Sequence, residues 1–309
     1  MVHGELVPPR EVRVLSGDAE LLDRLTALTG RGTVHSVFTR VVNVLTPRGE
    51  LIALTARDAA DAPRALVVDV ANWAGQGLVP GHGVTFTDQC LELDIPRHPL
   101  RLTPAGARAW RPVAPSLAHL SPGGFAAAAA RLDDLNRMHG PRGGMLGPVP
   151  GAGPMEAAVA AALDEGRTAL VAALRDRNDA AIRRGILALL GLGPGLTPAG
   201  DDFLTGLALL AALPGSGLAP LLPALRDTLD EHPGRTTDLS LATLAEAASG
   251  RVRSELIDVL RQLADESRSP RALHVPVHAV LAIGHTSGSD TLSGLAAGLH
   301  LEEELRGSL

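Results

Sequence analysis

The sequence contains no lysine and no tyrosine, and it has only one cysteine, Cys90. All 28 basic residues are therefore arginine, which excludes Schiff-base chemistry on lysine, covalent attachment of pyridoxal phosphate and a P-loop lysine. The absence of tyrosine excludes a tyrosyl acid or nucleophile. A lone thiol forms neither an internal disulfide nor a multi-cysteine zinc site, and it is typical of a reducing cytoplasm.

Long hydrophobic runs and excess positive charge are also absent. No segment reaches the ~18–20 apolar residues of a transmembrane helix, and the N-terminal MVHGELVPPREVRVL lacks the apolar run of a signal peptide. The net charge of −6 gives no electrostatic footprint for nucleic acid or an anionic membrane. We therefore expect a cytoplasmic protein with neither nucleic acid nor membrane as partner.

The 309 residues are 45% hydrophobic, which is enough for a packed core and predicts two domains or one large one. Residues 1–112 are rich in strand patterns, and the turn chemistry of 46–49 predicts a hairpin between two of them. We expect a small β-sheet or barrel-like unit there, with strands at 33–38, 41–45, 51–54, 64–70 and 84–93.

The pattern changes after residue 112. Residues 113–154 predict one helix, at 125–139, and then a Gly/Pro-rich connector. Residues 155–309 predict a mostly α-helical domain, so the fold class is α+β. Its helices are expected at 155–177, 180–190, 198–213, 218–230, 237–249, 254–266, 271–283 and 289–306.

The densest motif is GLGPGLTPAGDD at residues 191–202, where one helix ends in glycine and another begins. Thr197 suits the N-cap and Pro198 the first helical position. Free N–H groups there could bind an anion, and Gly193 and Gly195 would let the backbone approach it. Gly200 is a poor helix former, which predicts a close approach to that face of the helix.

Asp201 and Asp202 are consecutive and so point about 100° apart on a helix. One could face a ligand or Mg²⁺ while the other accepts backbone N–H bonds and holds the loop. The alternative is a capped helix start whose acids are favoured by the helix dipole.

A second copy of this chemistry occurs at GHTSGSDTLSGL, residues 284–295. Both copies read G-x-T, a spacer, then D-x-L-[T/S]-G-L, so Asp290 corresponds to Asp202. Gly206 and Gly294 lie inside the two helices, where close packing would exclude a side chain. The pair predicts two helix starts that meet around one ligand, unless the similarity is coincidence; the second copy adds the candidates Thr286, Ser287 and Gly288.

His285 is the histidine favoured for function, because an imidazole among Gly, Thr and Ser could move a proton or donate to an oxyanion. A hydrogen bond that merely fixes the loop is the alternative. Ser287, His285 and Asp290 also make a possible nucleophilic triad, although no G-x-S-x-G elbow occurs.

Three further segments contain candidate binding residues, and each also has a purely structural explanation. Arg235 could bind a carboxylate or phosphate beside the hydroxyls of Thr236, Thr237 and Ser240, or the segment could be a plain helix cap. Asn43 is a polar residue within an apolar strand. It could contact substrate, mark a β-bulge, or occupy an edge position where its hydrogen bonds are satisfied. Arg142-Gly143-Gly144 is either an anion-binding loop or a flexible connector.

His274 and His278 have the spacing of a helical metal pair. Pro276 lies between them and no H-E-x-x-H motif is present, so a metal site is disfavoured there.

Three segments together resemble a known family: GLGPGLTPAGDDFLTG at 191–206, TTDLS with LAEAASG at 236–250, and GHTSGSDTLSGL at 284–295. They are similar to a bacterial family, long catalogued as a domain of unknown function, that includes the small subunit of oxamate carbamoyltransferase from anaerobic allantoin breakdown. The strand with Val41-Val42-Asn43-Val44 resembles that family's N-terminal region.

The resemblance implies carbamoyl transfer between oxalurate and phosphate, a step of purine degradation, within a multi-subunit enzyme. Small anionic substrates and partner subunits are therefore expected, with residues 193–200 as the cradle, Asp201 or Asp202 organising a metal or the loop, and His285 moving a proton. Two other hypotheses stay open. One is a Mg²⁺-dependent hydrolase or phosphotransferase with Mg²⁺ on Asp201 and Asp202. The other is a non-catalytic subunit that binds an anion or nucleotide.

Overall fold

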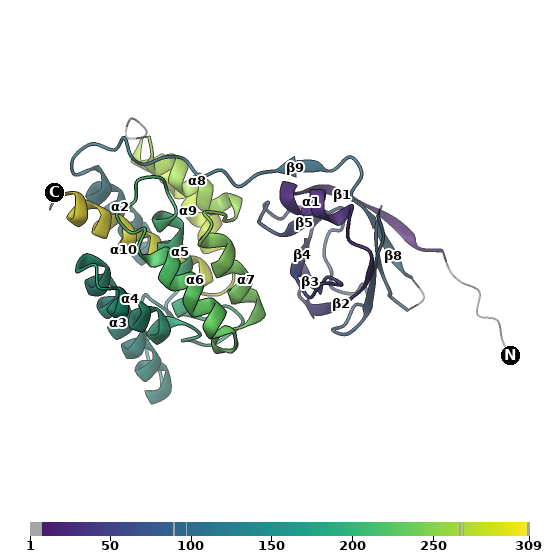
Figure 1. Cartoon of the computed structure of the whole chain (residues 1–309), viewed down its shortest axis with the longest axis horizontal. Coiled ribbons are helices and arrows are strands. Elements are labelled where there is room, and N and C mark those ends of the chain that lie inside the picture. Colours follow the sequence, from purple (N-terminus) through teal and green to yellow (C-terminus); the bar gives the residue numbers. More distant parts are fainter. Residues whose placement is uncertain (1–7, 89, 97, 266, 268, 308–309) are drawn as a thin grey trace. The chain divides into compact units, whose positions relative to one another are not determined.

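The computed structural model describes residues 8–88, 90–96, 98–265, 267 and 269–307. These residues form two compact units, divided between Pro112 and Val113. The first is built on strands and the second on helices, which confirms the predicted α+β class (Figure 1).

The N-terminal unit is a closed sheet. Strand β1 pairs with β8 through Arg10–Arg13 and with β5 through Val14–Gly17, so the sheet order β5-β4-β3-β2-β6-β7-β8-β1 returns to its own start, and β9 adds beside β1. Closure removes exposed strand edges. The elements are β1 (Arg10–Asp18), α1 (Ala19–Leu25), β2 (Gly30–Val37), β3 (Val41–Leu45), β4 (Leu51–Thr55), β5 (Ala65–Val68), β6 (Gly83–Phe86), β7 (Leu91–Leu93), β8 (Leu100–Thr103) and β9 (Arg108–Trp110).

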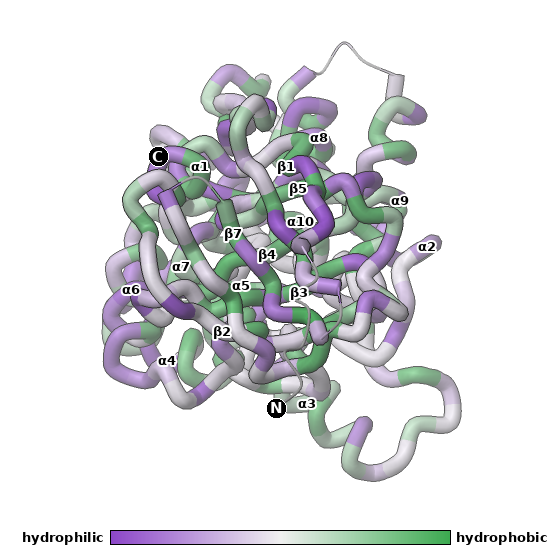
Figure 2. Tube along the Cα trace, turned by 90° about the vertical axis from the view of Figure 1, so that its right-hand side faces the viewer, coloured by the Kyte–Doolittle hydropathy of each residue, from purple (hydrophilic) through white to green (hydrophobic). Residues whose placement is uncertain are grey.

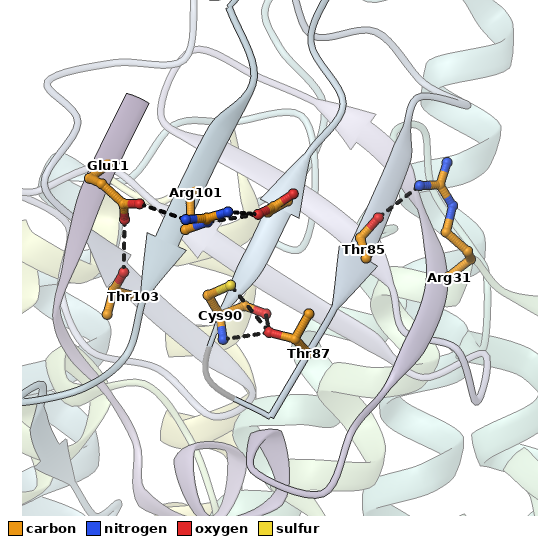
Figure 3. Close-up of polar contacts among 8 residues, drawn as sticks. Glu11, Arg31, Thr85, Thr87, Cys90, Arg101 and Thr103 are labelled. Carbon is orange, nitrogen blue, oxygen red and sulfur yellow. Dashed lines mark hydrogen bonds and ion pairs between the residues drawn. The ribbon is translucent and has the colours of Figure 1, made fainter. Parts of the chain in front are cut away.

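Alternating side chains fill the inside of this barrel with Val, Leu and Ile and give the outside a polar ladder. Arg101 on β8 lies opposite Glu11 on β1 and Glu92 on β7, and its guanidinium donates to both carboxylates, at 3.1 and 2.7 Å (Figure 3). On neighbouring strands Arg31 donates to Thr85 at 2.7 Å. Opposite charges at directly paired positions help fix the register.

The predicted hairpin is confirmed, because β3 and β4 pair antiparallel around the turn at 46–49. The single strand expected at 84–93 is wrong. It is split into β6 and β7, which pair with each other, and the Thr87 hydroxyl accepts the Cys90 N–H in the turn between them. Strands β1, β8 and β9 and helix α1 were not expected from the sequence.

The C-terminal unit consists of helices close to the expected ranges. They are α2 (Gly124–His139), α3 (Pro154–Arg175), α4 (Asp179–Leu189), α5 (Ala199–Ala211), α6 (Leu221–Glu231), η1 (Pro233–Arg235), α7 (Asp238–Ala247), α8 (Ser254–Leu263), η2 (Pro270–Leu273), α9 (His274–Leu281) and α10 (Ser287–Gly307). All residues of α5 are buried, and α10 packs along it with α2 on the other side of α10 (Figure 1). Helix α5 is therefore the centre of this unit.

Among the described residues no helix is both long and apolar enough to cross a membrane. Figure 2 shows hydrophilic and hydrophobic residues interspersed along the helices and strands. Residues 1–7, part of the segment searched for a signal peptide, lie outside the described residues. The cytoplasmic location stays a prediction.

Candidate functional site

Helices α5 and α10 cross at two glycines in a reciprocal way. A Cβ on Gly206 would collide with the Thr291 carbonyl, and a Cβ on Gly294 would collide with the Phe203 carbonyl. These are corresponding positions of the two sequence copies, so the helices are related by a local two-fold axis. The close packing expected at Gly206 and Gly294 is confirmed, and it brings the two motifs together.

The loops before the two helices meet through their hydroxyl groups. Thr197 Oγ1 lies 2.7 Å from Ser287 Oγ, and both residues are half-buried. The expected N-cap role of Thr197 is wrong: α5 begins at Ala199, Pro198 is the N-cap, and no side chain caps the helix. The Thr197 hydroxyl instead forms the hydrogen bond with Ser287 that joins the two motifs.

Asp202 lies beneath this hydroxyl pair. Its side chain is on the first turn of α5, and its Oδ2 atom is buried and accepts no hydrogen bond within the described part of the chain. Burial raises the pKa of Asp202 to about 8, and the charges of Asp290 and Asp201 add to the rise, while the Ser287 and Thr197 hydroxyls oppose it. Asp202 is therefore mostly a neutral acid at pH 7.

Asp290 is the corresponding acid of α10 and is fully buried. Its Oδ1 accepts the Met145 N–H at 2.6 Å, whereas its Oδ2 accepts no hydrogen bond from any described residue. Burial raises the pKa of Asp290 to about 6, and the hydrogen bonds from Met145 and Thr286 limit the rise. The group is mostly ionised at pH 7, so the two acids differ in charge.

The segment after α2 covers Asp290. Gly144 lies against the carboxylate so closely that a Cβ would collide with both oxygens. Gly143 has φ +120° and packs near Thr286, and its N–H donates to Gly147 O at 2.9 Å. Residues 143–147 are therefore an ordered part of the site.

Asp201 differs from Asp202 in that both of its carboxylate oxygens accept hydrogen bonds from the protein. It accepts the Gly191 N–H on Oδ1 at 2.7 Å and the Thr236 hydroxyl on Oδ2. Burial raises its pKa, while Thr236, Gly191 and Ser240 lower it. Asp201 thus ties the end of α4 to the start of α7, as the sequence proposed for one of the two acids. Asp202 is instead close enough to Asp290 for the charge of Asp290 to raise its pKa.

Two separate structural requirements explain the glycines in and beside this loop. Gly193 and Gly195 adopt φ of +122° and +97°, which other residues rarely reach. Gly200 and Gly288 instead face carbonyl groups of the preceding helices, Leu189 O and Val280 O. The group that closely approaches Gly200, as the sequence predicted, is therefore the backbone carbonyl of Leu189.

Three amides in the first turn of α5 donate hydrogen bonds within the chain. Gly200 N–H donates to Leu192 O at 2.9 Å, and the Asp201 and Asp202 N–H groups donate to Pro198 O at 2.9 and 3.1 Å. In α10 the N–H groups of Gly288 and Asp290 also donate within the chain, to Ile283 O and Thr286 O. These five amides are therefore already used within the chain.

His285 is exposed on the loop before α10, and its ring makes no hydrogen bond with a described residue. Asp290 is fully buried and bonded to Met145. The possible triad of Ser287, His285 and Asp290 is therefore not assembled here, and the loop-fixing alternative for His285 has no support. The imidazole is available to solvent beside Thr286 and Ser287.

The remaining candidates serve the scaffold in this structure. Arg235 donates to Leu187 O at 3.0 Å, at the end of α4. Thr237 caps α7 by accepting the Ser240 N–H and also donates to Leu196 O at 2.6 Å. Asn43 belongs to the N-terminal unit, where its Nδ2 donates to Ser36 Oγ at 2.9 Å opposite a bulge in β2.

Sequence reasoning missed Asn136 and Met145. The Asn136 amide is buried within α2 and donates to Ser289 O at 2.9 Å and Ser293 Oγ at 3.0 Å, which fixes α10 against α2. A lone asparagine on the apolar face of a helix was the available sign. Met145 acts through its backbone, which no side-chain pattern reveals.

Two family models match this chain. One, described as oxamate carbamoyltransferase subunit AllH, matches residues 189–299, and the other, the AllH family N-terminal domain, matches residues 13–109. The chain belongs to the AllH family. The AllH match contains both acid motifs and the loop between α4 and α5, and the N-terminal AllH match corresponds to the β-barrel. No solved structure matches the chain.

Proposed function

We propose that this AllH-family chain binds the carbamoyl group of a small anionic substrate between Asp202 and Asp290 and takes part in carbamoyl transfer to or from oxamate. The observation that carries the proposal is the meeting of two buried carboxyl groups, each with one Oδ2 that accepts no hydrogen bond from the described residues. A buried polar atom without a partner is costly unless a ligand satisfies it.

The opposite protonation of the two acids suits a carbamoyl group. A carbamoyl group has an NH₂ that donates and a carbonyl that accepts. Asp290, with a pKa of about 6, is an acceptor at pH 7, whereas Asp202, with a pKa of about 8, is a donor. The pair therefore complements both ends of the group.

Asp202 also supplies a general acid. In transfer from oxalurate, a phosphate oxygen bonds to the carbamoyl carbon and the bond from that carbon to the oxamate nitrogen breaks. The leaving nitrogen needs a proton, which neutral Asp202 holds. The proton of the attacking phosphate then restores the acid.

Hydroxyl groups and exposed basic side chains complete the site. The Thr197 and Ser287 hydroxyls lie above Asp202 and can donate to the oxyanion of the tetrahedral intermediate. Arg142 and His285 are exposed on the segments that adjoin Asp290 and Ser287. The Arg142 guanidinium and a ring N–H of His285 are the donors that would face a carboxylate or phosphate in solvent.

Calorimetric titration of oxamate and of carbamoyl phosphate into the full chain tests this proposal. We expect Asp202→Asn and Asp290→Asn to weaken binding at least tenfold, about 1.4 kcal/mol, while the exposed Asp230→Asn leaves it unchanged. Unchanged affinities in both folded site variants would show that the acids do not bind the substrate. Transfer activity, measured with partner subunits added, should fall in the same variants.

A Mg²⁺-dependent phosphotransferase remains the second candidate, because the same two Oδ2 atoms and the two hydroxyls are hard oxygen ligands. The ion would be held by Asp202 and Asp290, since both oxygens of Asp201 are already hydrogen-bonded. Mg²⁺ would polarise a phosphoryl oxygen there. Titration with Mg²⁺ separates the two: binding that needs both acids and precedes any binding of oxamate favours the phosphotransferase.

A further inference from the structure

We infer that His139, His274 and His278 form a binding site for one divalent transition-metal ion, with Zn²⁺ as the expected ion. The ligand nitrogens of these three exposed side chains all lie within 4.8 Å of one another. The site is separate from the acid pair and does not depend on the proposed function.

The local fold makes the cluster possible. His274 and His278 are one turn apart on α9, which begins at His274, so Pro276 lies in the first turn. A proline is tolerated there because the N–H it lacks would have no helical partner. The sequence argument that Pro276 disrupts the pair is therefore wrong, and both rings share one face of α9.

The third ligand comes from a distant part of the chain. His139 is the last residue of α2, and α2 packs beside α9. The His139 ring centroid is 4.6 Å from that of His278 and 6.3 Å from that of His274. A pair on one helix joined by a third histidine from another helix gives a three-sided arrangement of nitrogens.

The distances suit closure around an ion. Zn–N bonds of about 2.0–2.1 Å place tetrahedral ligands about 3.4 Å apart, so the nitrogens must approach by about 1.4 Å at most. Exposed side chains reach this by rotating χ angles. The cluster offers only imidazole nitrogen, which favours Zn²⁺, Cu²⁺ or Ni²⁺ over Mg²⁺ and Ca²⁺. A fourth position remains for water.

Metal at this point would hold two segments that lead into the acid site. The chain after His139 runs through Gly144 and Met145, which contact Asp290. The chain after α9 runs through residues 282–286 to Ser287. The ion would therefore act as a positioning element.

The test is titration of Zn²⁺ into tag-free, metal-stripped protein. We expect one equivalent to bind, and His139→Ala, His274→Ala and His278→Ala each to weaken binding at least about tenfold. His98→Ala, an exposed histidine of the other unit, is the matched control and should bind normally. Replacing Zn²⁺ with Co²⁺ should give visible absorption bands typical of four-coordinate Co²⁺, and the three variants should lose them.

The inference is overturned if the three variants bind Zn²⁺ as tightly as the parent, or if His98→Ala weakens binding equally. Metal-free unfolding curves of the variants check that they remain folded, which is expected because all three side chains are exposed. If variants that have lost Zn²⁺ binding still bind oxamate normally, the positioning role is overturned while the metal site itself stands.

Discussion

Asp202 and Asp290 are carboxyl groups whose neutral form the folded chain favours. The ordinary pKa of each is 3.8, and burial raises them to about 8 and about 6. Between the ordinary and the raised pKa, the folded state binds a proton that the unfolded state has released. The free energy of unfolding therefore falls as pH rises through that interval.

Asp202→Asn should remove the larger part of this pH dependence. Between pH 5 and 8 the folded parent keeps the Asp202 proton that its unfolded state has released, a cost that grows with pH and that the variant lacks. The free energy of unfolding of the variant should therefore rise relative to the parent by up to about 1.4 kcal/mol per pH unit between pH 5 and 8. Urea unfolding at several pH values measures it, with Asp230→Asn as the control; parallel curves for parent and Asp202→Asn would contradict it.

Gly144→Ala should disturb Asp290 with no change in any candidate side chain. A Cβ at this position collides with both carboxylate oxygens, so either the segment moves away or the carboxylate turns and loses the Met145 N–H. We expect stability to fall by about 1–3 kcal/mol and oxamate binding to weaken. Gly147→Ala is a poor control because Gly147 has φ +84°, so Gly153→Ala, which has open space around it, serves instead.

The sequence could predict that one of Asp201 and Asp202 holds the loop while the other is available to a ligand. It could not predict which acid has which role. That assignment depends on where α4 and α7 end and begin, since these supply the Gly191 N–H and the Thr236 hydroxyl. For the segment with Arg235, Thr236 and Thr237, the alternative of a plain helix cap is borne out at Thr237, which caps α7. Polar side chains in a loop can satisfy the scaffold as easily as a ligand.

At the scale of elements, the pairing of α5 with α10 determines the site. The repeated D-x-L-[T/S]-G-L pattern was sufficient to predict that glycines allow this approach, because a glycine inside a helix is unfavourable without a packing reason. Helical periodicity also located most helices. It did not separate η2 from α9 within the expected helix 271–283, where the start of α9 decides whether His274 and His278 share a face.

Gly206→Ala and Gly294→Ala should be equivalent in effect, because each Cβ meets a backbone carbonyl of the partner helix at a corresponding position. Backbone cannot rotate away as a side chain can, so the helices must separate. We expect each variant to lose about 2–3 kcal/mol of stability in urea unfolding and to weaken oxamate binding. Gly234→Ala, with nothing within 4 Å, should change stability little; a neutral result at both helix positions would contradict the reciprocal packing.

Strand prediction was weaker than helix prediction in this chain. The sequence predicts one strand over 84–93. The Thr87–Cys90 turn, fixed by the Thr87 hydroxyl, divides it. Pairing of β1 with β8, β5 and β9 depends on contacts between residues far apart in sequence, which local patterns do not contain.

The whole molecule consists of a barrel and a helical unit, and both acid motifs, the Gly144 segment and the histidine cluster lie in the second. The N-terminal unit has its own core of buried Val, Leu and Ile, which also includes Trp73. Each unit therefore has the apolar interior that independent folding requires.

Residues 113–309 expressed alone should fold cooperatively and retain the pH-dependent stability attributed to Asp202. Thermal unfolding followed by far-ultraviolet circular dichroism measures the first, and urea unfolding at pH 5 and 8 the second. A fragment without a cooperative transition would show that the helical unit needs the barrel.

The local two-fold axis between α5 and α10 has a consequence for how a ligand is oriented. A ligand on that axis would meet a threonine and an aspartate from each copy whichever way round it entered, whereas Ser287 has only Ala199 as its counterpart. Asp201 on one side corresponds to Ser289 on the other, and the acids of the two halves titrate differently. If the proposed site binds an asymmetric molecule, this departure from symmetry is what would distinguish its donor end from its acceptor end.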